Sequence, residues 1–65
     1  MKIVLNGAPR SVSSASLIQL LEELDLASAK VATAVNEEFV PVGARENCTL
    51  QEGDRVEIVA PMQGG

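Results

Sequence analysis

The chain has 65 residues with a formal net charge of −4, and 46% of them are hydrophobic, which is typical of one small domain with a packed core. The acidic balance and the single Phe are a poor match for nucleic acid, whose phosphates require Lys and Arg. The single cysteine excludes an internal disulfide and favours a reducing compartment. The chain contains no run of about 18 apolar residues, the length needed to cross a membrane. We therefore expect a soluble cytoplasmic protein with no nucleic-acid or membrane partner.

The N-terminal segment has the pattern of a β-hairpin. Met1, Ile3 and Leu5 alternate with residues that would point to the other face, as in a half-buried strand. Asn6-Gly7 follows, and this dipeptide is the strongest short hairpin signal. We expect residues 10–13 to form a short returning strand at an edge of the sheet.

A helix is predicted over about residues 17–25. Its apolar stripe has the spacing of one helical face and consists of Leu17, Leu20, Leu21 and Leu24. Ser16 is a suitable N-cap, and Gln19 three residues later completes a capping box. Glu22 and Glu23 fall on the opposite face, where we interpret them as solvated side chains rather than a catalytic carboxylate pair.

The rest of the chain predicts three more strands, over residues 31–35, 39–40 and 55–60. Pro41 ends the second of these, and residues 42–50 are expected to be irregular. One helix can cover only one face of a sheet, so the expected fold class is α+β, with a mixed sheet of four or five strands over one amphipathic helix. The helix leucines should pack against Ile3, Leu5, Val35, Val56 and Ile58, with the first and last strands as central neighbours.

The residues contain no self-contained active site. There is no histidine, and the single Cys48 has neither a base to activate it nor partners with which to hold zinc. The five glycines form no phosphate-binding motif. Asp25 and Asp54 are interpreted as helix-end and turn residues. We expect no catalytic residue, no metal site and no bound cofactor.

The sequence ends on Gly64-Gly65, and these two glycines contribute almost nothing to a fold. A frayed tail or a cloning scar would explain them as well as a function would. The α-carboxylate of Gly65 is nevertheless an ionised oxygen nucleophile at neutral pH, able to attack the α-phosphate of ATP. We expect a domain over residues 1–61 and a flexible tail over residues 62–65.

Three segments carry a resemblance to a known family: EGDRVEIVAPMQGG at 52–65, AVNEEFVP at 34–41 and the opening MKIVLNG. Together they resemble the ThiS family of sulfur carriers from thiamine biosynthesis, within the wider ThiS/MoaD group. The resemblance implies a β-grasp, ubiquitin-like fold. It also implies that Gly65 is the modified residue and that Gly64, Gln63 and Met62 are recognised as the tail.

The same resemblance implies the partners. An E1-like adenylyltransferase, ThiF, would use ATP and Mg to adenylate Gly65. Sulfur from a donor such as a cysteine desulfurase would then replace an oxygen, giving a thiocarboxylate. The thiazole synthase ThiG would take that sulfur for the thiazole ring.

Some residues depart from the family pattern and leave alternatives open. Glu37 stands where many relatives have Gly after Asn36, residues 42–49 lack a Trp, and Ala60-Pro61 is similar to the molybdopterin synthase subunit MoaD. A molybdopterin-type carrier, or a ubiquitin-like modifier that joins Gly65 to lysines, would use the same activation. A plain interaction domain with an idle tail is the third possibility.

A docking patch is also expected from strand alternation. Val4 and Val59 fall on the face of the sheet that the helix does not cover. Exposed apolar patches of this kind mark partner surfaces. We expect these two valines to form the patch, with Met62 extending it toward the tail.

Overall fold

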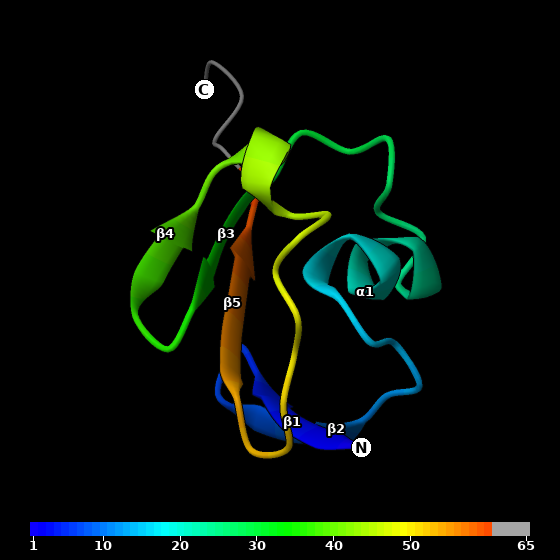
Figure 1. Cartoon of the computed structure of the whole chain (residues 1–65), viewed down its shortest axis with the longest axis vertical. Coiled ribbons are helices and arrows are strands. Elements are labelled where there is room, and N and C mark those ends of the chain that lie inside the picture. Colours follow the sequence, from blue (N-terminus) through cyan, green and yellow to red (C-terminus); the bar gives the residue numbers. More distant parts are fainter. Residues whose placement is uncertain (61–65) are drawn as a thin grey trace.

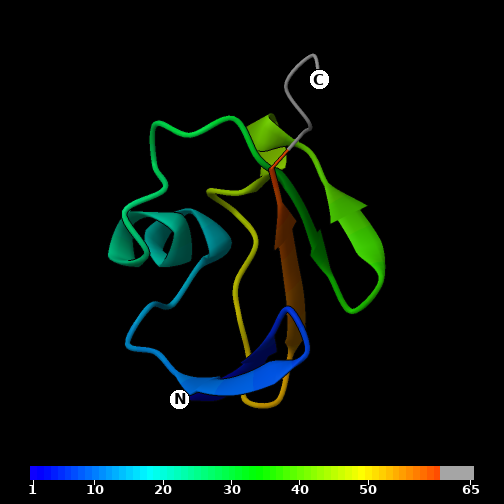
Figure 2. The ribbon, with the colours of Figure 1, turned by 180° about the vertical axis from the view of Figure 1, so that it is seen from behind.

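The computed structural model describes residues 1–60, and residues 61–65 lie outside the described part. Five strands form one sheet in the order β2-β1-β5-β3-β4, with α1 on one side of it (Figures 1 and 2). The strands are β1 (Lys2–Leu5), β2 (Ala8–Ser11), β3 (Ala32–Val35), β4 (Glu38–Val40) and β5 (Arg55–Val59). The mixed sheet over one helix is the predicted architecture.

The first and last strands are neighbours inside the sheet. β1 and β5 are parallel, with Val4 opposite Arg55 and Leu5 opposite Val56. All other pairs are antiparallel, and β2 and β4 form the two edges. In Figure 1, β1 and β2 lie across the lower end of β5, so the sheet is strongly twisted. The predicted central pairing of first and last strands is confirmed.

The core lies between α1 and the inner face of the sheet. Its fully or nearly fully buried members are Ile3, Val12, Leu17, Leu20, Leu21, Val40, Leu50, Val56 and Ile58. Leu5, Leu24 and Val35 pack against this cluster while remaining partly exposed. Every residue expected to pack between helix and sheet therefore does so. Met1 departs from the predicted alternation, because it is exposed at the start of the chain.

Helix α1 spans Leu17–Glu23, two residues shorter than predicted. The Ser16 hydroxyl accepts from the Gln19 backbone N–H, and the Gln19 side chain accepts from the backbone N–H of Ala15, a close variant of the predicted capping box. At the other end Asp25 has φ of 64°, and its N–H donates to the Glu22 carbonyl. This left-handed residue, with Leu26 donating to Leu21, forms a Schellman motif and stops the helix.

The segment after β4 is more ordered than the expected irregular loop. A short 3-10 helix, η1, spans Val42–Ala44, and the chain then runs between α1 and β5 (Figures 1 and 2). The Cys48 carbonyl accepts from Leu17 N–H at 2.8 Å, and Leu50 N–H donates to the Ala15 carbonyl at 2.9 Å. These bonds attach the segment to the start of the helix and bury Leu50.

Two hairpin turns have the same backbone shape. Asn6 and Gly7 have φ of 50° and 85°, and Asn36 and Glu37 have φ of 51° and 72°. Two successive positive φ values define a type I′ turn, whose twist matches that of the flanking strands. The Asn6-Gly7 turn was predicted. Glu37 occupies the position at which glycine is favoured.

Candidate functional site

The end of β5 is the part of the described chain that leads to the predicted tail. On one side, β3 pairs with it through Thr33 opposite Ile58 and Ala32 opposite Val59. On the other side, β1 turns away at Asn6, whose side chain takes over the pairing. The Asn6 Oδ1 accepts from the Ile58 N–H at 2.9 Å, and its Nδ2 donates to the Ile58 carbonyl at 3.1 Å.

The chain therefore leaves the sheet from a strand that is held on both sides up to Ile58. Four predicted site residues follow Ala60, namely Met62, Gln63, Gly64 and Gly65, and all four lie outside the described residues. Their roles remain predictions. The structure supplies the fixed point from which they start.

An apolar area does lie on the face of the sheet away from α1. Val59 is 58% exposed and Phe39 is 70% exposed. Ala32 is the register partner of Val59, and Ala34 is the register partner of Phe39, so the four side chains share the outer face. These residues, Ala32, Ala34, Phe39 and Val59, form what we call the outer patch.

The structure does not bring Val4 and Val59 together. Val4 is half-buried and lies opposite Arg55, at the other end of β5 from Val59. At about 3.3 Å per residue, the two ends of this strand are roughly 13 Å apart. Glu57, exposed on the same face, lies between them. Phe39 rather than Val4 shares the outer patch with Val59, because the register of β4 on β3 puts Phe39 opposite Ala34, two residues along β3 from the partner of Val59. The sequence did not reveal this register.

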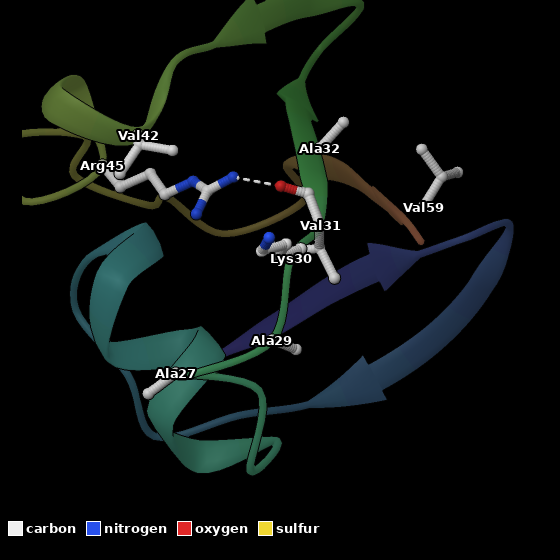
Figure 3. Close-up of a pocket in the computed structure, with 8 residues that line it drawn as sticks. All are labelled: Ala27, Ala29, Lys30, Val31, Ala32, Val42, Arg45 and Val59. Carbon is white, nitrogen blue, oxygen red and sulfur yellow. Dashed lines mark hydrogen bonds between the residues drawn. The ribbon is translucent and has the colours of Figure 1, made fainter. Parts of the chain in front are cut away.

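A second feature at this end of the sheet is a cavity of about 420 Å³ that we call the basic pocket. Its lining includes Val31, Val42 and Val59, together with two cationic side chains, Lys30 and Arg45 (Figure 3). The lining contains no acidic residue. It thus combines apolar walls with positive charge in a chain that is acidic overall.

Arg45 is only 6% exposed. Its Nε donates to the Thr33 hydroxyl at 3.0 Å, and its Nη2 donates to the Val31 carbonyl at 2.6 Å (Figure 3). Thr33 is itself buried and donates to the Val40 carbonyl at 2.8 Å. A polar chain thus links η1, β3 and β4. Sequence reasoning missed Arg45, since a single Arg in a segment expected to be irregular carries no periodic signal.

Cys48 lies in an environment that disfavours a nucleophilic thiolate. Partial burial, and secondarily the nearby Asp54 carboxylate, raise the pKa of its thiol. A raised pKa reduces the thiolate fraction at neutral pH. Cys48 and Val59 line different cavities. These observations agree with the expectation that Cys48 is not catalytic.

Glu23 has a role beyond the solvated helix face that was predicted. It is fully exposed, but its carboxylate accepts hydrogen bonds from the Ser14 hydroxyl and from the backbone and hydroxyl of Ser13. The Ser14 bond is the main cause that lowers the pKa of this carboxyl. Glu23 thereby fastens the segment before α1 to the end of the helix.

Residues 1–60 contain no cluster of three or more His, Cys, Asp or Glu side chains placed to hold a metal ion. Over the same residues, no helix has the length and apolar character needed to span a membrane.

Comparison with known proteins supplies the class. The model of the ThiS family matches residues 3–65, nearly the whole chain including the Gly64-Gly65 pair. The crystal structure of the thiamine biosynthesis protein ThiS from Geobacter metallireducens superimposes with a TM-score of 0.84 at 33% identity, covering all of both chains. An NMR structure of a thiamine biosynthesis protein from that organism gives a TM-score of 0.81 at 32% identity, covering all of this chain and 88% of that one. These matches confirm the β-grasp fold.

The relatives that are similar in sequence are of two lengths, one close to that of this chain and one much longer. The sulfur carrier protein ThiS of Thermus thermophilus is 42% identical over 62 residues, which cover 94% of this chain and 95% of that protein. A thiazole synthase of Paramagnetospirillum magneticum is 41% identical over 66 residues, which cover all of this chain and 20% of that protein. The chain thus spans about a fifth of the length of this longer relative.

The fold and the sequence define a β-grasp carrier domain. The chain belongs to the ThiS family. As a ThiS domain it is a sulfur carrier of thiamine biosynthesis and not an enzyme. The family match, together with relatives named as thiamine biosynthesis proteins, supports the thiamine pathway over the molybdopterin-type alternative.

Proposed function

We propose that the carboxylate of Gly65 is the group that carries sulfur. The observation that carries this proposal is the family match, which extends through residue 65. An E1-like adenylyltransferase would use Mg and ATP to convert the carboxylate into an acyl adenylate. The terminal sulfur of a persulfide on a donor such as a cysteine desulfurase would then attack the acyl carbon and displace AMP. Reduction of the resulting acyl disulfide by a thiol reductant would release the donor and leave the thiocarboxylate.

The acceptor in this proposal is a thiazole synthase. Two relatives named thiazole synthase, from Paramagnetospirillum magneticum and Magnetococcus marinus, contain a segment similar to this chain at 41% and 38% identity. A carrier segment and a synthase within one protein are expected to meet in space. We place the exchange in the cytoplasm, where one free cysteine, Cys48, is compatible with a reducing environment.

The two glycines have a physical role in this scheme. Without Cβ atoms, Gly64 and Gly65 let an enclosing active site grip the backbone closely and set the carboxylate in line with the α-phosphate. Misplacing reacting atoms by about 1 Å lowers rates by roughly a hundredfold. A side chain at either position would obstruct the channels of both enzymes.

The test is the intact mass of the protein purified from its own cells. We expect a fraction heavier by the exchange of one oxygen for one sulfur, and the same spectrum reports whether the chain ends at Gly65. Deletion of Gly65, or Gly64→Val, should abolish ATP–pyrophosphate exchange by the adenylyltransferase and leave the melting curve unchanged. Full exchange activity in either variant would disprove the proposal.

Cys48→Ser is the matched control for the site of sulfur attachment. If sulfur travels on Gly65, this variant still becomes a thiocarboxylate in a reaction reconstituted with ATP and a sulfur donor. A variant that fails to do so while folding normally would place a covalent step on the internal thiol.

A further inference from the structure

The basic pocket contains a buried positive charge that is matched only by neutral groups among the described residues. The two hydrogen bonds of the Arg45 guanidinium go to a hydroxyl and a carbonyl, and neither uses its third nitrogen, Nη1. Because Arg45 is only 6% exposed as a residue, its guanidinium loses part of its hydration, which two neutral acceptors replace only in part. A carboxylate entering the pocket would supply the missing counter-charge.

The position of Arg45 is fixed by its backbone as well as by its side chain. Its N–H donates to the Val42 carbonyl at 3.3 Å, and its own carbonyl accepts from the Ile18 N–H at 3.2 Å. The guanidinium is therefore held in place before any ligand arrives. A preorganised donor group of this kind binds a carboxylate without first losing side-chain freedom.

The other residues that line the basic pocket indicate which kind of chemical group could bind there. Lys30, which is exposed, adds a second positive charge, and Val42 and Val59 are 71% and 58% exposed. The pocket thus matches a carboxylate-bearing side chain flanked by apolar ones. A chain of net charge −4 would repel an acidic surface elsewhere, so this pocket is where an acidic partner group gains most from contact.

We propose that the basic pocket is the docking site for an acidic side chain of the thiazole synthase. This proposal rests on the proposed function, and it adds the chemistry by which the two proteins recognise each other. Val59 lines the pocket and lies one residue before Ala60, where the described chain ends. Docking there holds the carrier next to the origin of its reactive end, so the synthase contacts a rigid surface as well as the terminal residues.

The test is a calorimetric titration of the full chain into the purified thiazole synthase of the same organism. Lys30→Glu reverses an exposed charge of the pocket and should weaken binding by roughly tenfold or more. Arg10→Glu makes the same change of charge on β2, outside the pocket, and should alter the Kd by less than about twofold. Equal weakening by the two variants would show general charge repulsion and overturn the proposal.

Arg45→Met gives a second measurement, since it removes the buried charge and keeps an apolar stem. It should also weaken binding by roughly tenfold, with a melting curve showing that the variant is folded. If Arg45→Met is unfolded, Lys30→Glu against Arg10→Glu remains the deciding pair. Unchanged binding by Lys30→Glu disproves the docking site.

A small free carboxylate is the competing occupant, and sodium succinate is the probe for it. In a heteronuclear NMR titration we expect succinate to shift the Ala29 and Val42 signals without saturation in the low millimolar range. Saturation at micromolar succinate would assign the pocket to a small metabolite and overturn the partner proposal.

The titration also separates this inference from the sulfur chemistry. Binding is measured on the full chain and on the chain lacking Gly65, and the thiocarboxylate is measured by mass. If Lys30→Glu does not weaken binding to the synthase while the thiocarboxylate forms normally, only the docking site is refuted. If no thiocarboxylate is found while Lys30→Glu still weakens binding to the synthase, only the role of Gly65 is refuted.

Discussion

The two hairpin turns, Asn6-Gly7 and Asn36-Glu37, share a backbone shape and differ in what they hold. Each begins with an asparagine in the left-handed region, and each asparagine side chain reaches β5. Asn6 binds both backbone groups of Ile58 in a partly buried setting. Asn36 accepts from the Arg55 N–H at 3.0 Å and donates to the Asp54 carboxylate at 3.0 Å, both at the surface.

The comparison shows that one local motif can serve two ends of the same central strand. Asn36 fixes the beginning of β5, and Asn6 fixes the part from which the chain runs toward Gly65. The second residues of the two turns differ, so comparing them shows how much the left-handed backbone conformation alone contributes to stability. Gly7 has φ of 85° at no steric cost, whereas Glu37 has φ of 72° with a side chain attached.

The largest effect is expected from Asn6→Ala. It removes two partly buried hydrogen bonds and places a Cβ-bearing residue without a local partner at positive φ, a loss of about 2–3 kcal/mol in the free energy of unfolding. Urea denaturation measures the change. Asn6→Gly retains the left-handed backbone and should recover about 1 kcal/mol of the loss. Equal stability of Asn6→Ala and the parent would show that the side chain does not support β5.

Asn36→Ala should have about half that effect, a loss of about 1–1.5 kcal/mol. The number of hydrogen bonds lost is the same, but water reaches the exposed Arg55 N–H and Asp54 carboxylate and compensates for them. The same denaturation experiment measures it. A loss as large as that of Asn6→Ala would contradict the distinction between a partly buried and an exposed turn.

Substituting the second residue of each turn isolates the contribution of the backbone conformation to the free energy of unfolding. Glu37→Gly should stabilise the protein by about 0.5–1 kcal/mol, and Gly7→Glu should destabilise it by about 1 kcal/mol. A Cβ at Gly7 would meet no atom within 4 Å, so any loss there arises from conformation and not from a clash. Thermal melts of the two variants should shift in opposite directions, and shifts of the same sign would refute the comparison.

The smallest and most local effect is on amide exchange. Asn6→Gly should speed hydrogen exchange at the Ile58 N–H by about five- to tenfold, because its acceptor is lost. Asn36→Gly should do the same at the Arg55 N–H and leave Ile58 unchanged. Two-dimensional NMR in deuterated buffer resolves the two amides. Faster exchange at both sites in either variant would mean that the turns act on the whole sheet.

The sequence predicts those parts of this molecule that have a periodic or local signal. The leucine stripe of α1, the alternation in β1 and β5 and the Asn6-Gly7 turn all appear as expected. The placement of Arg45 and the pairing of Phe39 with Ala34 depend on contacts between distant segments, which no short pattern specifies. The contacts of Asn6 and Asn36 with β5 escape prediction for the same reason.

The same distinction between local signals and distant contacts explains which parts of the candidate site the sequence predicted. The Gly64-Gly65 pair was found from the sequence because its chemistry needs no neighbours, and its role remains a prediction. The outer patch was only half found, with Val59 in place and Val4 at the wrong end of β5. Patch membership depends on strand register, and the register of the β3–β4 hairpin decides whether Phe39 or another side chain joins Val59 in the outer patch.

The parallel pairing of β1 with β5 has a consequence for how the chain folds. Val4 lies opposite Arg55, so the central ladder joins residues from far apart in the sequence, and its formation requires closing nearly the full length of the chain. Such high contact order slows folding, and neither hairpin has a shared partner until β5 is in place. A chain that stops before Arg55 would lack the strand that joins the two hairpins into one sheet, and its core would lack Val56 and Ile58. β5 therefore completes the sheet, and it is the same strand that leads to the proposed reactive end.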